Sequence, residues 1–209
     1  MISMDEKTLT ELLRKYPTTM HGDDGKTVIT CVARLSFVHF KEPRRGDNPS
    51  SKPMYGCAAI LPPAADVSLL RSICEKAWSD RKCVSRTEPK AKPLKKQADN
   101  TKWEGFGDEG FYFNCSTINP VDLFNLDMTR APVDKFYSGC WGRLKIHSYD
   151  FDKGLNWGVS LGLQAVQFFA DDEKLGGGGN AADGFEAHGN AVNGSRPAQM
   201  PATGADSVW

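Results

Sequence analysis

The feature that most constrains the fold of this chain is an alternation of apolar and polar residues along several short segments. In segment 26–37, the polar residues Thr30, Arg34 and Ser36 alternate with an apolar series, Ile29, Cys31, Ala33, Leu35 and Phe37. Successive side chains of a β-strand point to opposite faces, so this segment is predicted to be a half-buried strand with Phe37 in the core. Further strands are predicted at 53–61, 111–118, 141–151 and 156–169, and the last two are expected to form a hairpin.

Two helices complete the predicted secondary structure. One is predicted from an N-cap at Asp66 to about Trp78, because apolar residues recur there at helical spacing: Val67, Leu70, Cys74 and Ala77. A short amphipathic helix is predicted over Met4–Lys15, ahead of Pro17. Five strands with one inserted helix predict a mainly β protein with an OB-fold-like, five-stranded, partly open barrel, and a β-sandwich is the alternative.

The charge of the chain is unevenly distributed, although 26 basic and 26 acidic residues give a net charge of zero. Residues 171–209 contain six acidic and two basic residues, a net charge of −4, which leaves +4 for residues 1–170. Residues 171–209 are also rich in Gly and Ala, so they bury too little apolar surface to offset their conformational entropy. We therefore expect a helical or extended lead-in at 1–25, an OB-fold-like domain at 26–170 and a flexible acidic tail at 171–209.

The predicted strand 141–151 has a face typical of nucleic-acid binding. Leu144 and Ile146 form its core side, and the opposite side carries aromatic and basic residues, Trp141, Arg143, Lys145, His147 and Tyr149. Aromatic rings stack on the bases of a single strand, and cations contact its phosphates. An ordinary solvated strand face is the alternative.

A second candidate surface is the segment Arg81–Lys96, which contains seven basic residues and one acidic residue. Pro89 and Pro93 exclude a continuous helix, so an exposed basic loop is predicted. Such a loop binds phosphates without reading sequence, and its affinity falls with salt. The candidate residues are Lys90, Lys92, Lys95 and Lys96, followed by Trp103 in a Gly-rich stretch; a solvated loop without a partner is the alternative.

The end of the sequence carries a large aromatic residue in the acidic tail. Trp209 follows Asp206 closely, and this pair is a candidate docking peptide whose ring enters a pocket of a partner protein. Alternatively, the tail folds back and competes with nucleic acid for the basic surface, or the end has no function.

Signatures of enzymes, metal sites and membrane segments are absent from the sequence. There is no Walker loop, G-x-S-x-G or H-E-x-x-H motif, and none of the six cysteines stands in a C-x-x-C pair, so no catalytic residue, cofactor or metal is predicted. In the alternative interpretation, in which the protein is a metal-dependent nuclease, Asp122, Asp127 and Asp134 are the candidate site residues. No apolar run reaches the roughly 18 residues of a membrane span, and the N-terminus lacks a secretory signal, so we expect a cytosolic protein.

Three segments resemble a family of phage-encoded proteins long catalogued as a domain of unknown function. Ala33–Pro43 (ARLSFVHFKEP) resembles the family's opening strand with its Phe-x-His-x-x-x-Pro-like signature, and Tyr137–Trp141 and Gly158–Gln167 resemble its two closing strands. The resemblance covers Lys26 to Phe169. It implies an OB-fold protein of phage replication or recombination that binds single-stranded DNA without sequence specificity or enzymatic activity, in the cytoplasm of the infected bacterial host. It also implies a tail that recruits replication partners and restrains DNA binding.

The residue patterns and the resemblance predict the same surface. The binding role is assigned to Arg34, Trp141, Arg143, Lys145 and Tyr149, with Phe40 and Tyr55 at the groove. The expected partners are single-stranded DNA, phage or host proteins at the tail, and further copies of the chain. Deletion of residues 171–209 is expected to preserve folding and affinity. A β-rich phage structural or assembly protein and a metal-dependent nuclease are the alternative functions.

Overall fold

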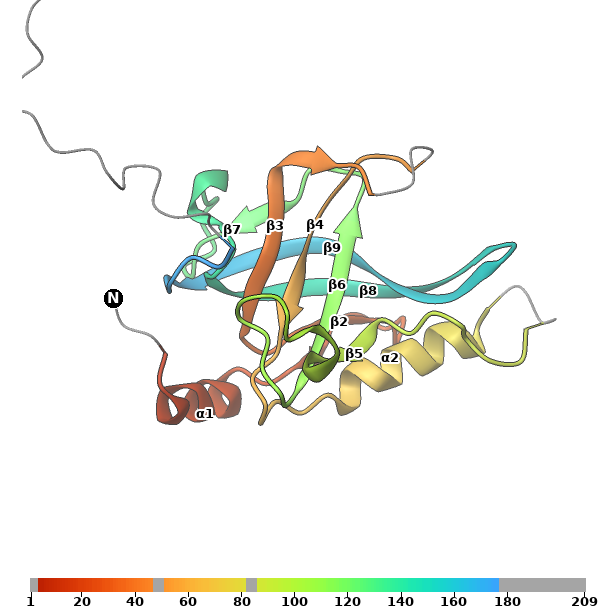
Figure 1. Cartoon of the computed structure of the whole chain (residues 1–209), viewed down its shortest axis with the longest axis horizontal. Coiled ribbons are helices and arrows are strands. Elements are labelled where there is room, and N and C mark those ends of the chain that lie inside the picture. Colours follow the sequence, from red (N-terminus) through yellow and green to blue (C-terminus); the bar gives the residue numbers. More distant parts are fainter. Residues whose placement is uncertain (1–3, 47–50, 82–85, 177–209) are drawn as a thin grey trace, which may run out of the picture. The chain divides into compact units, whose positions relative to one another are not determined.

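The computed structural model describes residues 4–46, 51–81 and 86–176 (Figure 1). Asp206 and Trp209 therefore lie outside the described residues. The elements follow one another in the order α1 (Glu6–Lys15), β1 (Thr19–Met20), β2 (Thr27–Ile29), β3 (Ala33–Arg44), β4 (Met54–Ile60), α2 (Ser68–Ser79), β5 (Leu94–Lys96), η1 (Gln97–Asn100), β6 (Phe111–Thr117), β7 (Asp122–Phe124), η2 (Val133–Lys135), β8 (Trp141–Lys153) and β9 (Asn156–Ala170).

Five long strands form a ring of backbone pairings. Strand β4 pairs with β3 on one side and with β6 on the other, both antiparallel. Strand β6 meets β9 in parallel at Ser116 and Gly162, and β9 forms the predicted hairpin with β8. Strand β8 returns to β3 where Ala33 pairs with Gly142. The ring confirms the predicted OB-fold-like arrangement of five strands.

The predicted strand 26–37 is two strands, because its pairing with β8 shifts register by one residue between Ile29 and Ala33. The Thr30 hydroxyl donates to the carbonyl of Cys31 (2.8 Å) and accepts from the backbone N–H of Leu144 (3.0 Å). Strand β2 thus stays beside the middle of β8, whereas β3 pairs only with the start of β8 and then runs along β4. The ring closes because β3 pairs with the start of β8 and also with β4.

Both predicted helices are present. Helix α2 starts at Ser68 with Val67 at the N-cap, so the predicted cap Asp66 lies one residue too early; its carboxylate accepts from the backbone N–H of Ser68 (2.8 Å) and from its hydroxyl (3.0 Å). It buries Leu70, Ile73 and Ala77 and lies beneath the β8–β9 hairpin (Figure 1). Helix α1 is capped by Asp5 and buries no residue. No helix in the described part of the chain is long and apolar enough to cross a membrane.

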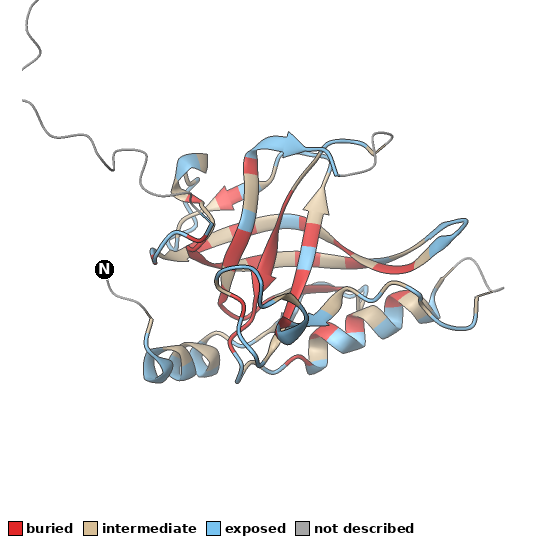
Figure 2. Ribbon diagram, viewed as in Figure 1, coloured by how far each residue is buried: buried red, intermediate tan, exposed pale blue. Residues whose placement is uncertain are grey.

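Within the described residues, two apolar clusters hold the fold together. The larger one fills the ring and includes Phe113, Leu35 and Leu144, none of which is exposed to solvent. Figure 2 shows this buried interior along β3, β4 and β6, and the exposed tip of the β8–β9 hairpin. The smaller cluster covers the outer side of β4 and β6 and consists of Ala58, Ile60, Phe106, Tyr112 and Leu175.

The side chains of β3 do not follow the predicted alternation beyond Ser36. The pairing of β3 with β4 shifts register between Ser36 and His39, and Phe37 adopts a positive φ of 49°. Phe37 is therefore 41% exposed rather than in the core. Phe40, predicted at the groove, is instead buried, and its ring packs against Phe136 with centroids 5.9 Å apart.

The packed part of the chain extends past the predicted boundary at residue 170. Asp172 and Leu175 are buried, and residues 171–176 bond to the fold. We call residues 171–176 the strap. The expectation that the flexible tail begins at 171 is corrected accordingly, because deletion from this residue would remove two buried side chains.

Candidate nucleic-acid interface

Strand β8 shows the predicted alternation, with one important exception. Leu144 and Ile146 are buried, and Tyr149 is 38% exposed. Trp141, however, is buried under the strap, and its indole N–H donates to Oδ2 of Asp172 (2.7 Å). A ring held in this way is not available to stack on a base, so we leave Trp141 out of the interface.

Two arginines of the predicted surface donate hydrogen bonds to backbone carbonyls of the protein. Arg34 donates from Nε to the carbonyl of Gly139 (3.3 Å) and from Nη2 to that of Glu173 (3.1 Å). Arg143 donates from Nε to the carbonyl of Thr30 (2.9 Å) and from Nη2 to that of Pro17 (3.2 Å). Burial lowers the pKa of Arg143. Both guanidinium groups therefore hold backbone segments together, and the donors that make these hydrogen bonds are not free to bind phosphates.

Arg143→Ala is expected to lower the free energy of unfolding by about 1–3 kcal/mol, because two carbonyls lose a charged donor. Urea unfolding measures this loss. The affinity of the folded variant for single-stranded DNA should stay within about twofold of the wild type, and its salt dependence should not change. A flatter salt dependence would return Arg143 to the binding surface.

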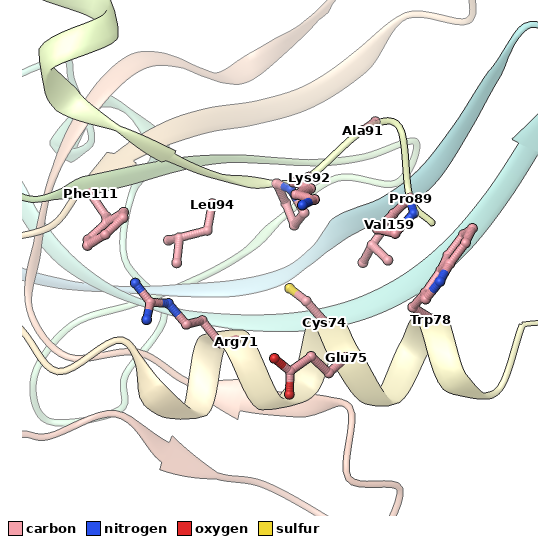
Figure 3. A pocket seen from close by; sticks show the side chains of 11 residues that line it. Arg71, Cys74, Glu75, Trp78, Pro89, Ala91, Lys92, Leu94, Phe111 and Val159 are labelled. Carbon is pink, nitrogen blue, oxygen red and sulfur yellow. The ribbon is translucent and has the colours of Figure 1, made fainter. Parts of the chain in front are cut away.

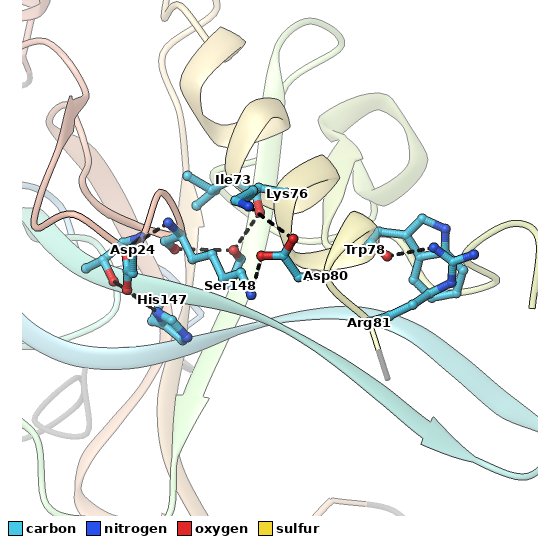
Figure 4. Close-up of polar contacts among 10 residues, drawn as sticks. Asp24, Ile73, Lys76, Trp78, Asp80, Arg81, His147 and Ser148 are labelled. Carbon is cyan, nitrogen blue, oxygen red and sulfur yellow. Dashed lines mark hydrogen bonds and ion pairs between the residues drawn. The ribbon is translucent and has the colours of Figure 1, made fainter. Parts of the chain in front are cut away.

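His147 and Lys145 lie where β8 pairs with β2. Nδ1 of His147 lies 2.9 Å from the Thr27 hydroxyl and 3.3 Å from Oδ2 of Asp24. The backbone N–H of Lys26 donates to Asp24 (2.9 Å) and holds the pKa of that carboxyl below its usual range. Lys145 is half-buried between Ile29 of β2 and Ala165 of β9. Figure 4 shows His147 beside Asp24, and the carboxylate of Asp80 beside Lys76 of α2.

Tyr149 lies two residues after His147 on the same side of β8, at the edge of a row of small residues that starts at Gly162, the partner of His147. A Cβ added to Gly162 would lie 3.5 Å from Cε1 of Tyr149, so the ring lies beside this glycine. Gly162 pairs with Ser116, and Ser116 pairs with Gly56, so the row crosses β9, β6 and β4. Asn114, which is exposed, continues this outer side of β6. We call this surface the outer face.

An aromatic pair stands at the opposite edge of the outer face. Phe37 and Trp103 are 41% and 47% exposed, and their rings meet edge to face with centroids 5.4 Å apart. Phe106 lies behind Phe37 (6.4 Å) and packs on Tyr112 of β6 (4.9 Å). The pair depends on the irregularity in β3 that turns Phe37 outward. Trp103 was predicted as a site residue from the sequence, but Phe37 was not. The irregularity in β3 that exposes Phe37 leaves no recognisable pattern in the sequence.

Residues 86–96 of the basic segment are docked against the fold and do not form the free loop that was predicted. Strands β6 and β9 pair at a single position, and the basic segment fills the gap between them. The backbone N–H of Ala91 donates to the carbonyl of Trp157 (2.9 Å), and that of Val159 donates to the carbonyl of Ala91 (3.0 Å). Strand β5 then pairs with β6, so that Lys95 lies opposite Tyr112.

The lysines of this segment remain at the surface. All four predicted residues are exposed: Lys90, Lys92, Lys95 and Lys96. Lys90 also donates to the carbonyl of Leu155 (2.9 Å), and the Arg86 guanidinium lies over the Trp157 ring, 3.9 Å from its centroid. Tyr55 is half-buried on β4, where it pairs with Thr117. The structure thus places Lys95 on β5 beside β6 and Tyr149 on β8 beside β9, and it places Arg34, Phe40 and Trp141 elsewhere.

A cleft lies on the other side of the basic segment, against α2, with a volume of about 430 Å³. Figure 3 shows its walls, with Arg71, Cys74, Glu75 and Trp78 on α2 and Pro89, Ala91, Lys92 and Leu94 on the basic segment. Burial raises the pKa of the Cys74 thiol to about 12, so this thiol is protonated at neutral pH. The cleft is mostly apolar and lacks the exposed stacking surface of the outer face.

The three aspartates considered for a nuclease are each engaged separately. Asp122 pairs with Arg130, Asp134 pairs with Lys41 (3.2 Å), and Asp127 accepts from the Thr129 hydroxyl (2.6 Å). Within residues 4–46, 51–81 and 86–176, no group of three or more His, Cys, Asp or Glu side chains is placed to hold a metal ion.

The ring of strands is shared with phage single-stranded DNA-binding proteins of known structure. The structure of the single-stranded DNA-binding protein from bacteriophage Enc34 in complex with ssDNA is 15% identical, with a TM-score of 0.64 over 78% of this chain and 99% of that chain. The structure without DNA is 14% identical, with a TM-score of 0.61 over 81% and 97%. The single-stranded DNA-binding protein of bacteriophage T7 is 11% identical, with a TM-score of 0.51 over 80% and 98%. At these identities the likeness establishes the OB-fold-like architecture.

The sequence itself identifies the family. The profile of the family described as Enterobacter phage Enc34, ssDNA-binding protein, matches residues 26–194. The chain therefore belongs to this family of phage single-stranded DNA-binding proteins, as its resemblance to a phage family predicted. The search of curated proteins gave no match.

Proposed function

We propose that the chain binds single-stranded DNA across its outer face, between the Phe37–Trp103 pair and Tyr149. The observation that carries this proposal is the exposed aromatic pair, 5.4 Å apart, at the edge of a row of small residues. Membership of the phage family supports the ligand class, and the solved relative in complex with ssDNA supports it further.

Each part of the outer face has a physical role in this proposal. Bases stack on the exposed rings, with about 1–3 kcal/mol for each stacked base. The small side chains at Gly56, Ser116 and Gly162 let the strand approach the sheet closely. Lys95, which pairs with Tyr112 on the outer side of β6, contacts phosphates, which adds affinity without sequence preference. Binding of this kind keeps DNA unpaired and involves no chemical step.

The biological setting is part of the same proposal. The protein would hold single strands during phage replication or recombination inside the infected host. The acidic residues beyond 176 would regulate binding or recruit protein partners through Asp206 and Trp209, and several copies would assemble along one strand. Because the contacts are to phosphates and to the faces of bases, binding should show no sequence preference, and its affinity should depend strongly on salt.

Lys95→Gln is expected to lower the affinity for single-stranded DNA and to flatten its salt dependence. Lys95 pairs with Tyr112 on the outer side of β6, and one lost phosphate contact reduces the slope of log K against log salt by about 0.7. Fluorescence anisotropy with a labelled oligonucleotide at several salt concentrations measures the slope. The matched control is Lys7→Gln, which removes one charge from the exposed side of α1. Equal slopes in the two variants would count against the lysine contact, and no binding by the wild type at low salt would overturn the proposed function.

A further inference from the structure

The strap, residues 171–176, packs against the residues that support Phe37 and Trp103. The amino-acid composition of this stretch did not predict these contacts. Leu175 is buried in the small apolar cluster with Phe106, the residue behind Phe37. The backbone N–H of Gly176 donates to the Glu104 carboxylate (2.8 Å), which is next to Trp103 in the chain. The strap therefore contacts the loop that carries Trp103 at two residues, Glu104 and Phe106.

The strap also reaches the part of β3 that presents Phe37. The backbone N–H of Leu175 donates to the carbonyl of Ser138 (2.8 Å). The Ser138 hydroxyl in turn accepts from the backbone N–H of Val38 (3.1 Å), directly after Phe37. One residue thus links the strap to the irregular part of β3, so both halves of the aromatic pair share the same support.

Two glycines allow the strap to lie this close. A Cβ at Gly139 would lie 2.0 Å from the carbonyl oxygen of Glu173, and one at Gly105 would lie 2.6 Å from Cδ1 of Leu175. Both glycines have positive φ, of 119° and 87°. Between them, Asp172 accepts from Trp141 and lies 3.8 Å from Arg34. The close fit along its whole length makes the strap a fixed part of the fold.

We infer that the strap is a positioning element for DNA binding, which holds Phe37 and Trp103 in the orientation that stacks on bases. This inference rests on the proposed function and adds a role to residues outside the outer face. A ring that is already ordered loses less side-chain and loop entropy when a base stacks on it. Without Leu175, the Trp103 loop loses its apolar contact, and the pair must be ordered at the moment of binding.

The test is a double-mutant cycle in the full-length chain with a labelled single-stranded oligonucleotide. Leu175→Ala is expected to weaken binding about fivefold or more, the low end of the loss for one stacked base. In a Trp103→Ala background, the same change should alter affinity by less than about twofold, because its effect passes through Trp103. Leu175→Met should retain affinity, and Leu126→Ala, at a 54% exposed leucine, is the control.

The possible outcomes separate the inference from the proposed function. Thermal unfolding sets a temperature at which every variant is folded, and Leu175→Val replaces Leu175→Ala if the latter does not fold. If Leu175→Ala binds like the wild type, or loses as much affinity with Trp103 absent as with it present, the positioning role is wrong and the interface stands. If Trp103→Ala itself binds like the wild type, both the interface and the positioning role are overturned.

Discussion

Phe37→Ala/Trp103→Ala is expected to weaken the binding of single-stranded DNA by about thirtyfold or more. Each stacked base contributes about 1–3 kcal/mol, so the loss of two rings removes at least about 2 kcal/mol. Phe37 has a φ of 49°, and alanine retains the Cβ of phenylalanine, so the substitution adds no backbone strain and removes the ring. Anisotropy titrations of the two single variants and the double variant give the loss and its additivity. Because the rings contact each other, the two single losses should not add.

The result has a matched control on the same molecule. Leu126→Ala/Met128→Ala removes two hydrophobic side chains that are 54% and 61% exposed near β7, away from the outer face. This control should bind like the wild type. The salt dependence of the aromatic variant should stay that of the wild type, because no charge is removed. Affinity equal to that of the control would remove the aromatic pair from the interface.

The sequence allowed the ring of strands to be predicted, because local alternation decides which segments can be half-buried strands. The predicted strands 141–151 and 156–169 appear as β8 and β9 with bounds close to those expected. The short strands β1, β5 and β7 were not predicted, since two or three residues carry no period. The break between β2 and β3 was also missed, because it depends on the pairing with β8 around Leu144, far along the chain.

The candidate site was harder to predict, because exposure depends on contacts between distant segments. Trp141 follows the strand pattern of a surface residue, yet its indole bonds to Asp172, in a stretch whose composition is that of a flexible tail. Arg34 is engaged by the same stretch. Conversely, Phe37 follows the pattern of a core residue and is exposed by a local irregularity in β3. The alternation of apolar and polar residues along a strand predicts its two faces. It does not predict which residues of the solvent-facing side are covered by other segments of the chain.

The second large effect is expected at the contact between the basic segment and β9. A Cβ at Gly158 would lie 2.2 Å from the carbonyl oxygen of Ala91 and 2.7 Å from its nitrogen, and Gly158 has a φ of 151°. Gly158→Ala should therefore push Ala91 away and break two backbone hydrogen bonds. With the backbone strain added, the free energy of unfolding should fall by about 2–5 kcal/mol. Urea unfolding measures this loss.

The same change should also separate phosphate contacts from stacking. Once Ala91 leaves β9, the basic segment that leads into β5 and Lys95 loses its fixed place, so the affinity for single-stranded DNA should fall and its salt dependence should flatten. Gly154→Ala is the control in the same hairpin, because its φ is 67° and nothing lies within 4 Å of the added methyl group. It should lose about 1–2 kcal/mol of stability from strain alone and bind with an unchanged salt slope. Matching losses in both variants would mean that strain in the hairpin, and not the docking of the basic segment, sets the stability and the affinity.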